Sequence, residues 1–150
     1  MASTVSATTL TSTITEGITL NGNSYGNAIT HTVASQGEVY SRTMSVATTE
    51  TTLINFGTAD ASGTVVGDSV SYMRYTNLDD TNYVQLCFKT SGEGAVNFSV
   101  KIGPGESYVC MNNQIHAAAS ATLGALVDVS SLTAKANTAE CDIELVIVSS

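Results

Sequence analysis

Three cysteines and two histidines are among the side chains that could act as nucleophiles, general bases or metal ligands: Cys87, Cys110, Cys141, His31 and His116. No two cysteines form a C-x-x-C pair, and the histidines form no H-E-x-x-H motif, so the spacing predicts neither a zinc site nor a disulfide framework. Each cysteine lies in or beside an apolar, strand-like stretch, which favours a reduced, buried small side chain. A Cys–His nucleophile pair is the alternative that these residue types leave open.

Two adjacent carboxylates, Asp79 and Asp80, could offer oxygen ligands to calcium. They lack the ligand spacing of an EF-hand. Asp residues between two strands commonly accept hydrogen bonds from their own backbone in a turn. A structural turn is therefore the preferred interpretation, and a calcium site is the alternative.

Three further patterns have structural explanations. Residues 97–99 fit the N-glycosylation pattern, but they fall within a predicted strand of a chain without a secretion signal. The Gly103-Pro104-Gly105 run is followed by no Lys-Ser/Thr pair and no helix, so it predicts a turn and not a phosphate-binding loop. Arg74 could lie over a tyrosine ring, but pairing with one of the many carboxylates is preferred. We therefore expect a protein that is not an enzyme and has no catalytic, cofactor-binding or metal-binding residues.

Tyrosine is the one abundant aromatic residue that could bind a sugar. The chain has six tyrosines and no tryptophan. Because the tyrosines are spread over several predicted strands, packing and subunit contacts are preferred over a sugar-binding platform. The six are Tyr25, Tyr40, Tyr72, Tyr75, Tyr83 and Tyr108.

The composition excludes several classes of partner. Five Lys and Arg residues against 13 Asp and Glu give a formal net charge of -8, and charged residues make up 12% of 150 residues. So few cations predict no nucleic-acid binding, and the negative charge disfavours anionic membranes. Residues 1–15 lack the charged and apolar regions of a signal peptide, and no run approaches 18 apolar residues. We expect a protein made in a cytosol that leaves it, if at all, by lysis.

The pattern of apolar residues predicts strands and not helices. Val96, Phe98, Val100 and Ile102 alternate with polar residues, which is typical of a half-buried antiparallel strand. Turn signals recur every 8–12 residues, which favours an all-β, antiparallel β-sandwich with eight to ten short strands. We expect residues 16–150 to form this single domain and residues 1–15 to form an N-terminal arm, either frayed or extended over about 50 Å. Strands are expected over 8–15, 18–20, 29–34, 38–46, 51–56, 70–77, 83–89, 96–102, 107–111 and 141–148, and residues 125–129 and 133–137 are two further candidates.

Three connections carry specific expectations. Residues 70–77 and 83–89 are predicted to form a hairpin around a loop of about five residues. The turn at 91–94 leads to the next strand, and the turn at 103–106 reverses the chain direction. The Ala-rich residues 117–121 could form either a short helical turn or a loop.

Three segments resemble a family of small virion proteins encoded beside the structural genes of tailed bacteriophages. Residues 74–84, RYTNLDDTNYV, resemble the family pattern R-x-T-N-L-D-x-T-N-[FYH]-V. Residues 101–106, KIGPGE, resemble K-[LI]-x-x-G-E, and residues 136–144, ANTAECDIE, resemble A-N-T-A-x-[CV]-D-[IL]-E. The resemblance covers the second half of the chain.

The resemblance implies a capsid cement, or decoration, protein. Such a protein is a β-sandwich, expected here to be jelly-roll-like, that is assembled in the host cytoplasm and lies on the outer surface of the capsid. Its implied partner is the major capsid protein, and its implied state is a homotrimer at three-fold and quasi-three-fold axes. The alternatives are a tail or baseplate component, or a host-glycan-binding β-sandwich module.

Overall fold

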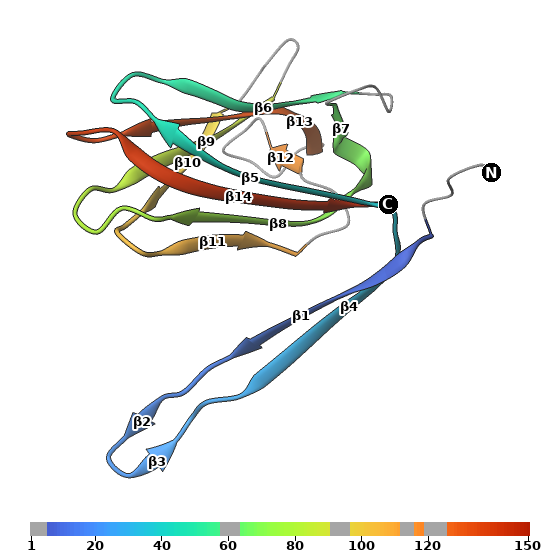
Figure 1. The fold of residues 1–150 in the computed structure, drawn as a ribbon. Coiled ribbons are helices and arrows are strands. Elements are labelled where there is room, and N and C mark those ends of the chain that lie inside the picture. Colours follow the sequence, from blue (N-terminus) through green and yellow to red (C-terminus); the bar gives the residue numbers. More distant parts are fainter. Residues whose placement is uncertain (1–5, 58–63, 91–96, 112–115, 119–125) are drawn as a thin grey trace.

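The computed structural model describes residues 6–57, 64–90, 97–111, 116–118 and 126–150. These residues form an all-β structure with one short 3-10 helix, η1 (Gly67–Ser69), and confirm the predicted antiparallel β-sandwich (Figure 1). Fourteen strands lie in this part of the chain, ten of them with four or more residues. The strands are β1 (Thr8–Thr15), β2 (Thr19–Leu20), β3 (Asn23–Ser24), β4 (Ala28–Gln36), β5 (Glu38–Val46), β6 (Thr51–Gly57), β7 (Val65–Val66), β8 (Val70–Asn77), β9 (Val84–Thr90), β10 (Asn97–Ile102), β11 (Ser107–Cys110), β12 (His116–Ala118), β13 (Leu126–Ala136) and β14 (Cys141–Ser149).

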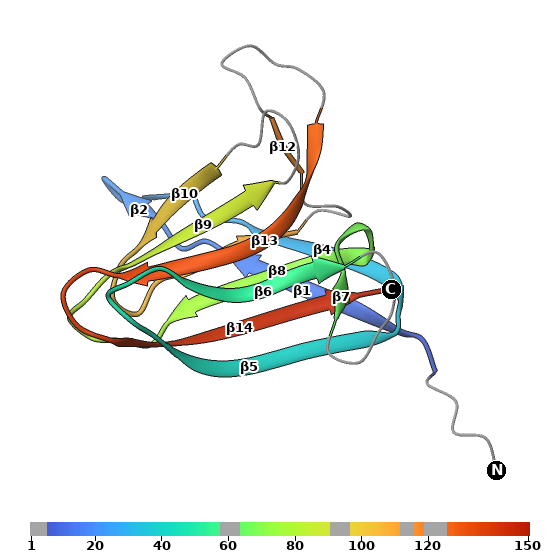
Figure 2. The ribbon, with the colours of Figure 1, turned by 90° about the horizontal axis from the view of Figure 1, so that it is seen from above.

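Two sheets with matching strand orders form the body of the molecule. One sheet has the order β11-β8-β14-β5, and the other has the order β10-β9-β13-β6-β7, with β12 paired to β13. The connections β5–β6, β8–β9, β10–β11 and β13–β14 each pass from one sheet to the other. The two sheets form the layers seen in Figures 1 and 2.

The core fills the space between these sheets because inward positions alternate with outward ones along each strand. On β14, Ile143, Leu145 and Ile147 are inaccessible, and Glu144 and Val146 between them are half-buried. Burying one such aliphatic side chain contributes about 1.5–3 kcal/mol. The largest fully buried side chains are Tyr75, Met73, Leu86, Leu132, Ile143, Leu145 and Ile147.

The predicted hairpin of residues 70–77 and 83–89 is wrong. Strand β8 pairs with β14 and β11, whereas β9 pairs with β10 and β13 in the other sheet. Buried Asn77 explains the crossing, because its Nδ2 lies 2.8 Å from the carbonyl oxygen of Asn82 and 3.0 Å from that of Gly103. The side chain thus satisfies polar backbone groups between the two layers.

The N-terminal strand belongs to a β-ribbon that extends well beyond residue 15. Strand β1 pairs with β4, β2 pairs with β3 at the tip, and this ribbon projects away from the sandwich (Figure 1). The boundary expected after residue 15 is therefore displaced: the projecting unit ends at Gln36, and the sandwich begins at β5. The displacement follows from the Asn21-Gly22 turn, where both residues have positive φ and fold β2 back onto β3.

Some expected segments lie partly or wholly outside the described residues. These are the turn at 91–94, residues 1–5 of the expected arm, and the first residue of the strands expected at 96–102 and 125–129. In the Ala-rich segment, residues 117–118 are extended in β12 opposite Val127 and Leu126, and 119–121 lie outside the description.

Candidate functional site

One face of the projecting ribbon carries an exposed apolar stripe. Antiparallel pairing places Leu10 opposite Val33 and Ile14 opposite Ile29, with Ser12 and His31 between them. Ile14 is 41% exposed and Ile29 is 58% exposed. Beyond this stripe, the tip adds exposed Ile18, Leu20 and Tyr25. The stripe is interrupted by the Ser12–His31 pair, and Leu10 and Val33 are half-buried. Apolar side chains that remain exposed on one surface in this way favour a binding surface.

The other face of the ribbon is made of hydroxyl groups. Thr11, Thr13 and Thr15 alternate with the apolar residues on β1, and Thr30 and Thr32 do so on β4. The hydroxyls of Thr13 and Thr30 hydrogen-bond across the strands at 3.2 Å. The ribbon is therefore two-sided, and the apolar side is the side that gains most from burial.

His31 lies within the apolar stripe and not beside a cysteine. Its Nε2 atom is inaccessible and has no hydrogen-bond partner among the described residues. The structure places Cys87 on β9 of the sandwich and His31 on the ribbon, so it brings no Cys–His nucleophile pair together at these positions. The backbone of His116 pairs with Asp128 at the start of β13.

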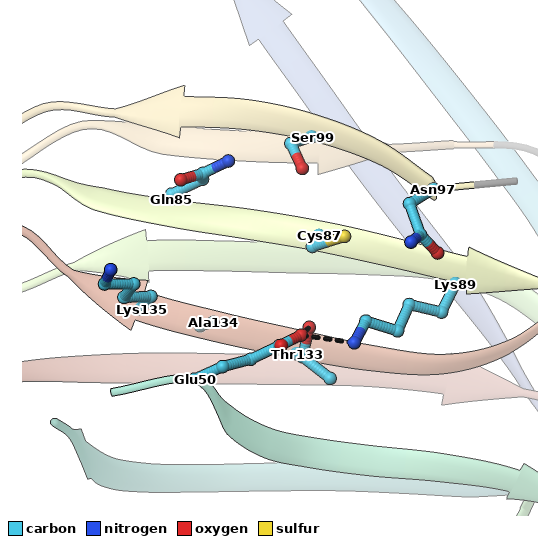
Figure 3. Close-up of a pocket in the computed structure, with 9 residues that line it drawn as sticks. All are labelled: Glu50, Gln85, Cys87, Lys89, Asn97, Ser99, Thr133, Ala134 and Lys135. Carbon is cyan, nitrogen blue, oxygen red and sulfur yellow. Dashed lines mark hydrogen bonds and ion pairs between the residues drawn. The ribbon is translucent and has the colours of Figure 1, made fainter. Parts of the chain in front are cut away.

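A polar hollow of about 260 Å³ lies on the outer face of the β10-β9-β13-β6 sheet (Figure 3). At its centre, the hydroxyl of buried Thr133 donates to Oε1 of Glu50 at 2.6 Å. The Lys89 ammonium forms an ion pair with the same oxygen. The full lining is Glu50, Gln85, Cys87, Lys89, Asn97, Ser99, Thr133, Ala134 and Lys135.

The charges in this hollow hold each other in the ionised state. The hydrogen bond from Lys89, followed by that from Thr133, lowers the pKa of the Glu50 carboxyl. The same contact with Glu50 raises the pKa of Lys89. Glu50 therefore remains ionised, because the Lys89 ammonium and the Thr133 hydroxyl both stabilise its carboxylate.

The three cysteines are free and lie apart from one another. Cys141 is buried and its thiol lies 3.5 Å from the carbonyl oxygen of Ala139. Burial raises the pKa of Cys110 and of Cys141, which makes both thiols poor nucleophiles. Cys87 is half-buried and faces the polar hollow (Figure 3).

The Asp79-Asp80 pair forms a turn. The Asp79 carboxylate accepts hydrogen bonds from the amide nitrogens of Thr81 at 2.8 Å and Asn82 at 2.5 Å. These two backbone bonds, that from Asn82 first, lower the pKa of Asp79. Among the side chains that the structure describes, no three His, Cys, Asp or Glu residues lie close enough together to hold a metal ion.

Arg74 pairs with a carboxylate, as preferred from the sequence. Its guanidinium lies 2.6 Å from Oε2 of Glu144 and 2.5 Å from the hydroxyl of Thr76. The cation that lies over an aromatic ring is instead Lys101, 4.4 Å from the centre of the Tyr83 ring. These contacts are partly solvated, so each contributes at most about 1 kcal/mol.

The tyrosines do not form one platform. Tyr75 is fully buried and Tyr40 and Tyr108 pack against the core, whereas Tyr25 is exposed at the ribbon tip. Residues 97–99 begin β10, and the 103–105 run forms a turn with Gly105 at φ +68°. The Glu106 carboxylate accepts a hydrogen bond from the Gly103 amide at 2.7 Å and closes this turn.

One catalytic motif was missed by inspection of the sequence. Residues 22–26, GNSYG, match the G-x-S-x-G pattern of hydrolases. That pattern requires a sharp strand-to-helix turn, but Ser24 ends the two-residue strand β3 at the exposed ribbon tip. The motif therefore lacks the structural context that would make Ser24 a nucleophile.

Comparisons with protein families, curated proteins and solved structures found no match to this chain. Among the described residues, no helix has the length and apolar character required to cross a membrane.

Proposed function

We propose that this protein is a jelly-roll capsid cement protein that binds the major capsid protein on the outer surface of a tailed-phage head as a homotrimer. The role in the virion follows from the resemblance of residues 74–84, 101–106 and 136–144. The jelly-roll connectivity is supported by the strand order β5-β14-β8-β11 in one sheet and β6-β13-β9-β10 in the other.

The observation that carries the proposal is the apolar stripe on the projecting ribbon. A two-stranded ribbon alone in water is marginally stable. Here Ile14 and Ile29 gain only part of the possible free energy of burial from their own fold, because they remain 41% and 58% exposed. Docking this side on another protein would bury them at about 25 cal/mol per Å² of apolar surface. A ribbon of this kind suits a protein that reaches a neighbouring subunit.

The three segments that carry the resemblance meet at one end of the sandwich. The Asn77 amide donates to the carbonyl oxygen of Glu106 at 3.0 Å, and the Leu78 amide donates to that of Asp142 at 2.9 Å. The Asn137 amide donates to the carbonyl oxygen of Tyr83 at 3.2 Å. The shared residues therefore have a structural reason to occur together, since they tie the connections between the sheets.

The proposal is tested on heads assembled without this protein, to which purified protein is added back. We expect the wild type to bind the heads and to raise their resistance to heat and dilution. The double substitution Ile14→Thr, Ile29→Thr should abolish binding, and Thr11→Ser, Thr30→Ser on the opposite side of the ribbon is the matched control. The proposal is overturned if the protein occurs only in purified tails, or if a glycan array captures it and heads do not.

A further inference from the structure

All three lysines of the chain project from the outer face of one sheet. The cross-strand register of β10, β9 and β13 aligns Lys101 with Gln85 and Lys135. Lys89 lies on the same side of β9, four residues beyond Gln85. We call Lys89, Lys101 and Lys135 the lysine face. Because the chain has a formal net charge of -8, these three lysines make the outer face of this sheet differ in charge from the rest of the protein.

Four carboxylates gather at the end of the sandwich where the connections β8–β9 and β13–β14 meet. Asp79, Asp80, Glu140 and Asp142 line one open depression with Ser45 and Leu78. The Leu78–Asp142 backbone hydrogen bond of 2.9 Å holds the two connections together. We call these four residues the acidic edge. Within the described part of the chain, no Lys or Arg forms an ion pair with any of them.

The lysine face already holds one carboxylate in place. Glu50 reaches it from the connection between β5 and β6, and its Oε1 accepts from Thr133 and pairs with Lys89 (Figure 3). Thr133 is 4% exposed, so this hydroxyl is a fixed donor rather than a mobile surface group. The side chain of Glu50 is itself 52% exposed. An incoming carboxylate would meet the partly exposed Lys89 ammonium, together with Lys135, for which no carboxylate partner occurs among the described residues.

We propose that the lysine face of one copy binds the acidic edge of a second copy of this chain. Charge complementarity favours a second copy as the partner. Two copies with a net charge of -8 repel each other unless a negative surface of one meets the lysine face of the other. The contact joins two different surfaces, so each copy offers one of each, and the assembly closes into a ring or grows into a chain. The inference rests on the proposed function in one respect only, namely that the ring is expected to close with three copies.

The test is the mass of the wild-type protein in solution, measured by light scattering and by sedimentation across a range of concentration. At about 0.05 M salt we expect self-association, and at about 1 M salt we expect dissociation, because the Debye length falls from over 10 Å to about 3 Å. The double substitution Lys101→Glu, Lys135→Glu should weaken association at least about tenfold. Arg42→Glu makes the same kind of charge change on β5 of the other sheet and should leave association unchanged.

Two further variants make the assignment specific. Asp80→Lys, Asp142→Lys should fail to self-associate alone, and should associate when mixed with Lys101→Glu, Lys135→Glu. Glu50→Gln should strengthen association, because it removes the negative charge that neutralises Lys89 and so leaves the lysine face more positive. The proposal would be overturned by a wild-type protein that stays monomeric at about 0.05 M salt. It would also be overturned if either charge-reversed double variant alone associated as well as wild type. If a wild type that is monomeric in solution still binds heads, this inference fails while the proposed binding to the major capsid protein stands.

Discussion

Ser71 and Gln36 join the sandwich to its projecting ribbon through a buried hydrogen bond. The Ser71 hydroxyl donates to Oε1 of Gln36 and lies 3.2 Å from the carbonyl oxygen of Val148. The amide nitrogen of the Gln36 side chain donates to the carbonyl oxygen of Ala34 at 2.9 Å. Both side chains are almost inaccessible, at 4% and 2% exposure. This contact fixes the position at which the ribbon leaves the body.

Replacing Ser71 with alanine is expected to lower the free energy of unfolding by about 1–3 kcal/mol, because the Gln36 oxygen would stay buried without a donor. Chemical denaturation measures the change. Ser41→Ala, at an exposed position on β5, is the control and should change stability by less than about 0.5 kcal/mol. The double substitution Ser71→Ala, Gln36→Leu removes both partners and should recover most of the loss. No recovery would show that the hydrogen bond is not the cause.

Replacing Tyr75 with phenylalanine is expected to stabilise the protein. Its hydroxyl is inaccessible and has no hydrogen-bond partner among the described residues. Tyr75→Phe removes this group and should raise the free energy of unfolding by about 1 kcal/mol, or the melting temperature by about 2–4 °C. Tyr25→Phe, at the exposed ribbon tip, should have no measurable effect. A destabilised Tyr75→Phe protein would contradict the prediction.

The same residue predicts a pH dependence at the alkaline side. Burial raises the pKa of Tyr75 above its ordinary value. The folded state therefore retains the proton that the unfolded state loses above about pH 10, so this stability is complete below pH 10 and falls as the pH rises further. Wild-type stability should decline more steeply between about pH 10 and 11 than that of Tyr75→Phe, as urea unfolding at each pH would reveal. Parallel declines would refute it.

Asp79 predicts a pH dependence at the acid side. The backbone amides of Asn82 and Thr81 lower the pKa of its carboxyl in the folded state. Its contribution is therefore present above the unfolded pKa of about 4 and is lost as the pH falls through the lower folded value. The stability difference between wild type and Asp79→Asn should shrink as the pH falls from about 6 to 3. Asp79→Ala, which also removes the hydrogen-bond acceptor, should be less stable than Asp79→Asn at every pH.

Amide hydrogen exchange should divide the molecule at Gln36. Strands β1 and β4 pair only with each other among the described strands, and their residues are mostly exposed, so local opening of the ribbon costs little. We expect the amides of Ser12 and His31 to exchange orders of magnitude faster than those of Met73 and Leu145 in the free protein. Equal protection of the ribbon amides and the sandwich amides would contradict the interpretation that the ribbon has no core of its own. If the ribbon amides become protected only when the protein is bound to heads, this would support the proposed docking.

The strands were predictable where one side chain in two points to the core. The alternation along Val70–Asn77 and Cys141–Ser149 predicts both strands within one residue, because each has one face in the core. The pairing was not predictable, since the turn at Asp79 suits a hairpin and a crossing between sheets equally well. One contact that holds the crossing joins Asn77 to the carbonyl oxygen of Gly103, which lies 26 residues away along the chain.

For the candidate surfaces too, the local sequence pattern predicted which residues share a strand face, but not which distant strands lie beside one another. Leu10 and Ile14 were predictable as residues of one strand face, but their partners Val33 and Ile29 follow only from the ribbon register. Lys89, Lys101 and Lys135 are separated by 12 and 34 positions along the sequence. Nothing local indicates that three different strands bring them to one face.

The passage from ribbon to sandwich has a mechanical consequence. Only Gly37 separates β4 from β5, and β5 pairs with β14 in nine consecutive positions from Glu38 opposite Ser149 to Val46 opposite Cys141. A force pulling the ribbon along the direction of β5 would load this whole ladder in shear, so that its hydrogen bonds resist together instead of opening one by one. A ribbon held at its far end could then bear tension in the way a tether does, with the sandwich as its anchor.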